Sequence, residues 1–180
     1  MVQLHIARPK RLADPVNYVQ LREIEERYPN VKLIVAHLGR AYADEDLGDA
    51  LEYLKDTKKM MWDFTANTNA HVMEKVLNYF GPERFIYGSD FPIFRMKARR
   101  TVVNGFYINE IPAGSLGDVS SDPHMREIAG PEADKITFFI YEEMLSCKRA
   151  CERLHLTRDD VEKIFYRNAA NLFGLETLGA

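Results

Sequence analysis

The sequence lacks the features that mark several large classes of protein. It has only two cysteines among 180 residues, Cys147 and Cys151, which stand four residues apart in a helical pattern. No apolar run approaches the roughly 20 residues that span a membrane, and no apolar stretch follows a basic start as in a signal peptide. We therefore expect a cytoplasmic protein without a membrane partner, whose two cysteines are reduced thiols on one face of a helix.

An excess of positive charge is also absent. The formal net charge is -3 and the pI is about 6.0, which argues against a general nucleic-acid binder. Hydrophobic residues make up 46% and charged residues 28%, as in ordinary globular proteins, and 180 residues suffice for a substantial core. We expect a single domain over residues 1–180.

What the sequence does contain is a repeated strand and helix unit with a period of about 30 residues. Asp14 before Pro15 is typical of a helix start, and Gly81 before Pro82 is typical of a helix end. Alternating strands and helices predict an α/β fold with a parallel sheet and right-handed crossovers. We predict four parallel strands in chain order, each followed by a helix, at residues 2–7, 31–37, 60–65 and 84–88.

The regularity ends after the fourth strand. Residues 93–134 contain scattered Gly, Pro, Ser and Asp, and we predict a long loop insert there, which is uncommon inside a domain and usually functional. Two helices are expected to close the chain, over about 135–154 and from Thr157 to Gly174, with Asp160 supporting the Thr157 cap. The first of these helices has as core candidates Phe138, Phe139, Tyr141, Leu145 and Ala150.

Polar side chains stand at the ends of the predicted strands. His5 lies in the C-terminal part of the first, His37 closes the second, Asp90 follows the fourth, and Asp63 and Thr65 lie in the third. Because parallel strands place their carboxyl ends at one edge, these side chains should converge on one site. Imidazole is a good zinc ligand, and a carboxylate binds metals and accepts protons from water. The alternative for each histidine is a hydrogen-bonded core residue.

Several of these segments resemble the amidohydrolase superfamily, in its aminocarboxymuconate-semialdehyde-decarboxylase-like branch. The run LIVAHLGR at 33–40 resembles the H-x-G strand of that branch, and GSDFP at 88–92 resembles its final strand. The segment around His5 resembles the preceding histidine strand, and NAANLFGL at 168–175 resembles the closing helix. The resemblance spans nearly the whole chain apart from residues 93–134.

The resemblance implies a (β/α)8 barrel with one divalent metal ion, often Zn, of which this chain is the C-terminal half. It implies that His5 is a metal ligand, that His37 polarises substrate or water, and that Asp90 binds the metal and acts as the base. The reactions it implies are hydrolysis of C–N or C–O bonds, hydration and non-oxidative decarboxylation.

The sequence departs from the family at one point. It has no H-x-H pair, which supplies two metal ligands in the family's first strand, and a complete barrel needs about 250 residues. We expect a fragment, a truncated gene product or one half of a split protein, whose open sheet edges pair with a missing N-terminal half or a homo-oligomer partner. Two ligands are also fewer than the three plus water of a catalytic zinc site.

Three arginines are candidates for holding an anionic substrate. Arg8, Arg40 and Arg95 each follow a strand on the predicted catalytic side, where a carboxylate or phosphate would bind; the alternative is a solvated basic surface. We predict a metal-dependent hydrolase or related decarboxylase that acts on a small anionic molecule. The alternative is an inactive fragment, or a ligand-binding or assembly domain that lacks the metal site.

Overall fold

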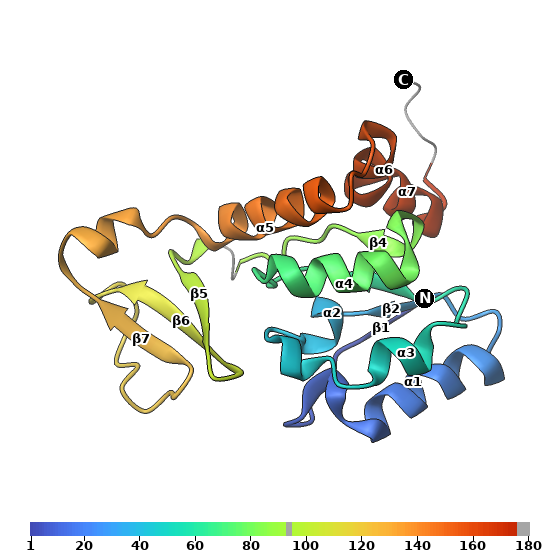
Figure 1. Cartoon of the computed structure of the whole chain (residues 1–180), viewed down its shortest axis with the longest axis horizontal. Helices are drawn as coiled ribbons and strands as arrows, with labels where there is room; N and C mark the ends of the chain where they lie inside the picture. Colours follow the sequence, from blue (N-terminus) through green and yellow to red (C-terminus); the bar gives the residue numbers. More distant parts are fainter. Residues whose placement is uncertain (93–94, 176–180) are drawn as a thin grey trace.

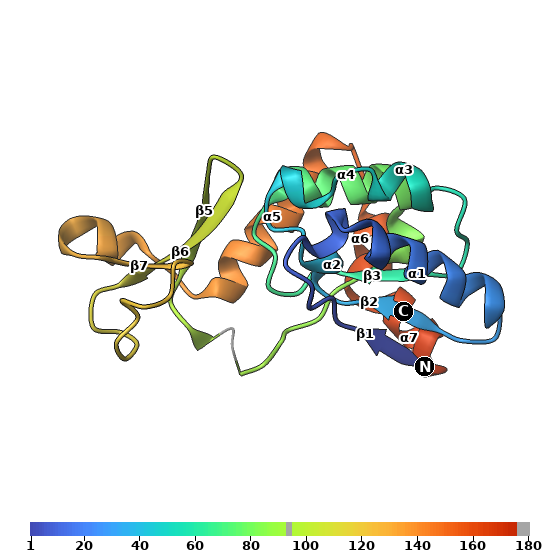
Figure 2. The same cartoon turned by 90° about the horizontal axis from the view of Figure 1, so that it is seen from below.

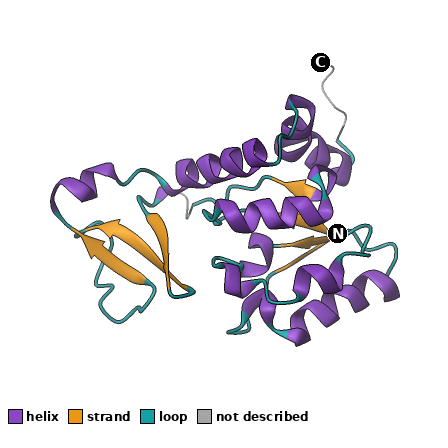
Figure 3. Cartoon of the chain, viewed as in Figure 1, coloured by secondary structure: helices purple, strands orange, loops and turns teal. Residues whose placement is uncertain are grey.

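The computed structural model describes residues 1–92 and 95–175 of the chain. They form two parts, a parallel sheet with helices packed on it and a smaller three-stranded sheet, joined by a long helix (Figures 1 and 3). The strands are β1 Val2–Leu4, β2 Leu33–Val35, β3 Met61–Asp63, β4 Phe85–Ile86, β5 Arg99–Val103, β6 Phe106–Pro112 and β7 Met125–Ile128.

The helices alternate with the strands of the parallel sheet and then close the chain. The α-helices are α1 Pro15–Arg27, α2 His37–Arg40, α3 Ala50–Leu54, α4 Ala70–Phe80, α5 Phe139–Arg153, α6 Arg158–Glu162 and α7 Asn168–Phe173. Short 3-10 helices are η1 Arg11–Ala13, η2 Asp44–Asp46, η3 Pro82–Arg84 and η5 Gly130–Lys135, and a π-helical turn, η6, covers Lys163–Arg167. None of the described helices has the length and apolarity that a membrane crossing requires.

The first sheet has the order β1-β2-β3-β4 with every pair parallel, as the strand and helix alternation predicts. Side chains alternate between its two faces. One face, the outer face, carries the main core together with α1, α3, α4 and α5, and includes Leu33, Val35, Trp62, Phe64 and Phe85. The opposite, inner face has a small apolar cluster of Ile34, Met61 and Ile86 against Leu172 of α7. Figure 2 shows α7 on the side of the sheet away from α3 and α4.

The helix ends follow the local chemistry of the sequence. The Asp14 carboxylate accepts a hydrogen bond from the Val16 N–H at 3.0 Å and caps α1, with Pro15 at its first position. Thr157 and Asp160 form a reciprocal capping box at α6. Both cysteines of α5 are free and buried. The Asp14 cap, the position of Pro15, the cap at Thr157 and the two free cysteines on one helix are as the sequence predicts.

The segment 93–134 is not the irregular loop that its composition predicts; residues 93–94 lie outside the described residues. It contains an antiparallel hairpin, β5 and β6, to which β7 adds in parallel. Asn104 and Gly105 form the hairpin turn with φ of 51° and 74°. Asn-Gly favours this two-residue turn because both residues tolerate positive φ, so the signal was present in the sequence. As a consequence, β4 is followed by a second sheet and only later by a helix.

The helix expected at 135–154 begins later, at Phe139, after the 3-10 turn η5. Of its core candidates, Phe139 and Ala150 are buried, but Phe138, Tyr141 and Leu145 are 41%, 59% and 39% exposed. The correction follows from helical geometry, because only one face of α5 packs on α4 and the candidates were drawn from both faces.

Candidate active site

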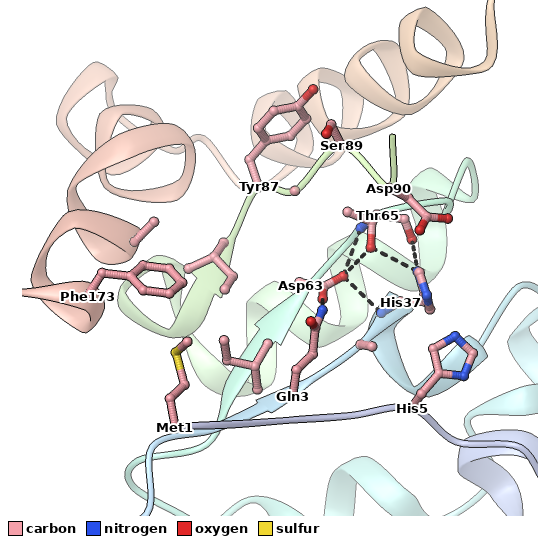
Figure 4. A pocket seen from close by; sticks show the side chains of 15 residues that line it. Met1, Gln3, His5, His37, Asp63, Thr65, Tyr87, Ser89, Asp90 and Phe173 are labelled. Atoms are coloured by element: carbon pink, nitrogen blue, oxygen red, sulfur yellow. Dashed lines mark hydrogen bonds between the residues drawn. The ribbon is translucent and has the colours of Figure 1, made fainter. Parts of the chain in front are cut away.

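A cavity of about 500 Å³ lies where the strands of the parallel sheet end. Its lining includes His5, His37, Asp63, Thr65 and Asp90, which come from all four strands or the residues directly after them (Figure 4). We call it the strand-end cavity. The structure therefore brings together His5, His37 and Asp90, the three residues that the sequence proposes for metal binding and catalysis.

The turn after β2 is left-handed, and this places His37 at the cavity. His37, Leu38 and Gly39 have φ of 56°, 51° and 67°. A Cβ on Gly39 would lie 2.9 Å from the Leu12 side chain, so glycine is needed here for both its conformation and its size. The backbone N–H of His37 donates to Asp63 Oδ1 at 2.9 Å, which ties the turn to β3.

The ring of His37 is oriented by Thr65. Its Nδ1 lies 2.9 Å from the Thr65 carbonyl oxygen and 2.8 Å from the Thr65 hydroxyl oxygen. A carbonyl oxygen only accepts, so Nδ1 carries the hydrogen and donates it. In the neutral ring the lone pair is then on Nε2. That nitrogen is free to accept a proton or to bind an electrophile.

Asp63 organises this arrangement. It is buried and accepts hydrogen bonds from Gln3 Nε2 at 2.9 Å, from the N–H groups of His37 and Thr65 at 2.9 and 3.1 Å, and from the Thr65 hydroxyl. With its oxygens so engaged, its role is to position His37 and Thr65. Asp63 is recognisable in the sequence as a polar residue of the third predicted strand, but no role follows for it there; the available signal is a lone carboxylate inside a buried strand.

His5 stands beside His37. The two rings meet edge to face with centroids 4.6 Å apart. Burial lowers the pKa of His5 below its usual value of 6.5, and His37 and Arg40 add to this, while Asp90 and Asp63 oppose it. His5 is therefore neutral at pH 7, the form in which imidazole binds a metal.

Asp90 is exposed and lies in the turn after β4 with φ of 43°. The preceding Gly88 allows this segment to approach β3, because a Cβ there would lie 2.6 Å from the Thr65 methyl carbon. Close contact between the GSD segment and Thr65 is thus what sets Asp90 on the rim of the cavity that His37 also lines.

The predicted substrate arginines lie elsewhere, and none is among the described residues that line the strand-end cavity. Arg8 forms an ion pair with Asp14 at 2.6 Å. Arg40 is half-buried and donates to the Ile6 carbonyl oxygen at 3.3 Å, and Arg95 is exposed. Substrate binding by these three residues stays a prediction.

The described residues do not by themselves fit a complete metal site. Within 1–92 and 95–175, no group of three or more His, Cys, Asp or Glu side chains is placed to hold an ion. His5 and Asp90 offer donor atoms, but the oxygens of Asp63 are occupied by hydrogen bonds. A catalytic zinc site needs three protein ligands and an open position.

The family model described as amidohydrolase matches residues 1–110. The chain belongs to the amidohydrolase family. No curated protein sequence matches it.

Solved structures resemble this chain at low sequence identity, and the first two share its fold. "Amidohydrolase 2" from Bifidobacterium longum subsp. infantis is 16% identical with a TM-score of 0.50, covering 97% of this chain and 49% of that one. An amidohydrolase from Burkholderia multivorans with bound zinc is 15% identical with a TM-score of 0.51, covering 88% and 50%. A dihydroxybenzoic acid decarboxylase from Polaromonas sp. JS666, with bound manganese, is 13% identical with a TM-score of 0.45, covering 90% and 40%. The chain thus spans about half the length of the first two structures.

Proposed function

We propose that this chain supplies the C-terminal half of a (β/α)8 barrel in a metal-dependent hydrolase of the amidohydrolase type. A non-oxidative decarboxylase of the aminocarboxymuconate-semialdehyde-decarboxylase-like branch is the related form of the same proposal. The observation that carries it is the convergence of His5, His37 and Asp90 on the strand-end cavity. The family match and the four parallel strands in chain order support it.

The proposal includes a completing half. In the parallel sheet, β1 and β4 are edge strands, and a closed barrel has no edges. The inner face carries Gln3 and Asp63 next to a small apolar cluster on which Leu172 of α7 packs, and in the proposal the remaining strands of a barrel enclose this face. We propose that an N-terminal half or a partner copy contributes those strands and the missing metal ligands.

Three residues of the cavity and the nearby Arg40 have roles in the proposal. His5 and Asp90 are the two metal donors of this chain, and zinc is the proposed ion because the Burkholderia multivorans structure has bound zinc. His37, held by Thr65 with its lone pair on Nε2, polarises the substrate or the attacking water. The exposed Asp90 carboxylate accepts the proton of that water. Arg40, close enough to lower the pKa of His5, attracts a small anionic substrate.

A second candidate function is a non-catalytic ligand-binding or assembly domain. One observation favours it, namely that the described residues place no three metal-binding side chains together. The two candidates differ in the affinity for zinc after the barrel is completed, and they share the fold.

Zinc titration of the purified chain is the first test. We expect weak binding, because two donors cannot supply the roughly 10–16 kcal/mol of a full structural site. Asp90→Asn and His5→Asn should each weaken it further, while Asp122→Asn, at an exposed aspartate between β6 and β7, should leave it unchanged. If the Asp90 variant and the parent bind zinc with equal affinity, Asp90 is not a metal ligand.

Turnover by the completed barrel is the second test, with zinc content measured in parallel. Asp90→Asn should lower turnover about 100- to 10,000-fold, the usual range for loss of a general base. His37→Asn should lower turnover with little change in zinc content, because its role is to polarise. If the Asp90 variant keeps near-normal turnover, the active-site assignment is wrong and the resemblance to the family concerns the fold alone.

A further inference from the structure

A second cavity, of about 340 Å³, lies between α4, α5 and β5. It shares no lining residue with the strand-end cavity. Three arginines line it, Arg100, Arg149 and Arg153, and we call it the arginine cavity. We propose that it binds the phosphate group of a small phosphorylated metabolite. This proposal does not depend on the chemistry assigned to the strand-end cavity.

Two of the arginines stand on one face of α5. Arg149 and Arg153 are one helical turn apart, a spacing at which like charges repel and weaken the helix. Arg153 is balanced by Glu74 at 3.1 Å. Arg149 has no ion pair within the described part of the chain. An anion between the two would remove the repulsion that their placement creates.

The third arginine is held in place without a carboxylate partner. The Arg100 guanidinium carbon lies 4.0 Å from the centroid of the Tyr42 ring, 4.8 Å from that of Tyr107 and 5.0 Å from that of Phe139. It donates to Asn109 Oδ1 at 2.9 Å. A cation removed from water needs a counter-charge, and these neutral partners supply orientation without one. Arg100 thus presents a rigid, uncompensated charge to the cavity.

The remaining lining adds the positive end of a helix. Asn69 caps α4 and already accepts the N–H groups of His71 and Val72, so this 11-residue helix contributes the positive end of its dipole to the cavity. The Thr68 hydroxyl has no hydrogen-bond partner within the described residues, but it is closed off from solvent and adds no accessible donor.

Charge and size together favour a phosphate group. The nearby carboxylates are already matched, Asp44 by His71 and Lys75 and Glu74 by Arg153. The three arginines carry more positive charge than one carboxylate neutralises. They match the two negative charges and several oxygens of a phosphate group. The volume lies at the small end of ligand sites, which fits a small metabolite.

The test is calorimetric titration of the purified chain with inorganic phosphate, in a buffer without phosphate or sulfate. Arg149→Gln should weaken binding about tenfold, as expected for loss of one charge-assisted hydrogen bond. The matched control is Lys148→Gln at the neighbouring position of α5, which removes the same charge and should leave the affinity unchanged. Lys148 is exposed and, among the residues that the structure describes, pairs only with Glu152, at 3.5 Å. Arg149 is exposed too, so its substitution leaves the core intact.

Three outcomes would overturn the proposal: no phosphate binding at millimolar concentration, equal weakening in the two variants, or succinate binding as tightly as phosphate. Glycerol phosphate should bind at least as tightly as phosphate. Vesicles containing phosphatidic acid should not bind in an Arg149-dependent way, and if they do, the ligand is a lipid headgroup and the metabolite is excluded.

Discussion

The two faces of the parallel sheet are built from the same strands, but the outer face forms the core and the inner face lines the candidate site. On the outer face Trp62 stacks on Phe80 with centroids 4.8 Å apart, and Phe64 stacks on Phe85 at 5.0 Å. On the inner face, the side chain directly after Trp62 is Asp63, which accepts hydrogen bonds from side chains and backbone around the cavity. Consecutive residues of β3 therefore point to opposite faces of the sheet, Trp62 into the core and Asp63 into the candidate site.

The difference shows how stability and chemistry are divided. Burial of large apolar side chains gives each about 1.5–3 kcal/mol, whereas a net hydrogen bond gives about 1 kcal/mol. The outer face therefore holds the fold together, and the inner face fixes the orientation of His37 and Thr65. If this division is right, substitutions on the two faces should separate stability from site geometry.

The largest effect is expected on the outer face. Phe64 is fully buried and contacts the rings of Phe85, Tyr87 and Phe165. Phe64→Ala should lower the free energy of unfolding by about 4 kcal/mol, through lost burial and the cavity left behind. Urea denaturation measures it. The control is Phe91→Ala, because Phe91 is 70% exposed and should change stability by less than about 0.5 kcal/mol.

Glu143 of α5 is the exception on the apolar side, and it gives the second prediction. It is fully buried, one carboxylate oxygen accepts from the Ala66 N–H at 3.2 Å, and the other has no partner within the described residues. Burial raises the pKa of this carboxyl to about 9, and Asp63 and Asp90 add to the rise against the opposing Ala66 hydrogen bond.

The sign of the pH effect follows from that shift. The folded pKa lies above the unfolded value of 4.5, so the unfolded chain loses this proton first as the pH rises. Its contribution to stability is complete below pH 4.5 and is lost between there and about pH 9. Glu143→Gln should equal the parent near pH 4 and be more stable at pH 7 by up to about 3 kcal/mol. Urea denaturation at several pH values tests this, with exposed Glu152→Gln as control; parallel curves for parent and Glu143→Gln would contradict it.

The sequence predicts the parallel sheet well because local patterns determine it. Each strand is an apolar run, and caps such as Asp14 and Asn69 mark helix starts. The hairpin at Asn104-Gly105 was missed because its turn signal lies beside a basic run and among scattered turn residues. The face of α5 was misjudged because helical spacing does not say which side meets a partner.

The candidate site was predictable only in part. Strand ends identify His5, His37 and Asp90, because the geometry of parallel strands brings them together. The hydrogen bonds that orient them depend on residues far apart in sequence, such as Gln3 with Asp63, and no spacing rule predicts those. The arginine cavity is likewise assembled from β5 and α5, whose proximity only the folded chain shows.

Asp63→Asn is the smallest expected change in stability and the sharpest test of the inner face. The substitution keeps the size of the side chain and one acceptor oxygen, but it turns an NH2 group toward donors and removes the charge. We expect a loss of about 2 kcal/mol, typical of hydrogen bonds to a charged group. Asp56→Asn, an exposed aspartate, is the matched control and its stability should change little.

The more informative measurement is the nitrogen NMR spectrum of His37. In the parent protein the His37 ring carries its hydrogen on Nδ1, because the Thr65 carbonyl oxygen accepts it. With a neutral amide oxygen in place of the carboxylate, Thr65 and the His37 N–H are held less firmly and the ring should populate both tautomers, whereas Phe64→Ala should leave the tautomer unchanged in the molecules that stay folded. A single Nδ1–H tautomer in the Asp63 variant would mean that the Thr65 carbonyl alone orients His37, and that the inner face needs no buried carboxylate to set its chemistry.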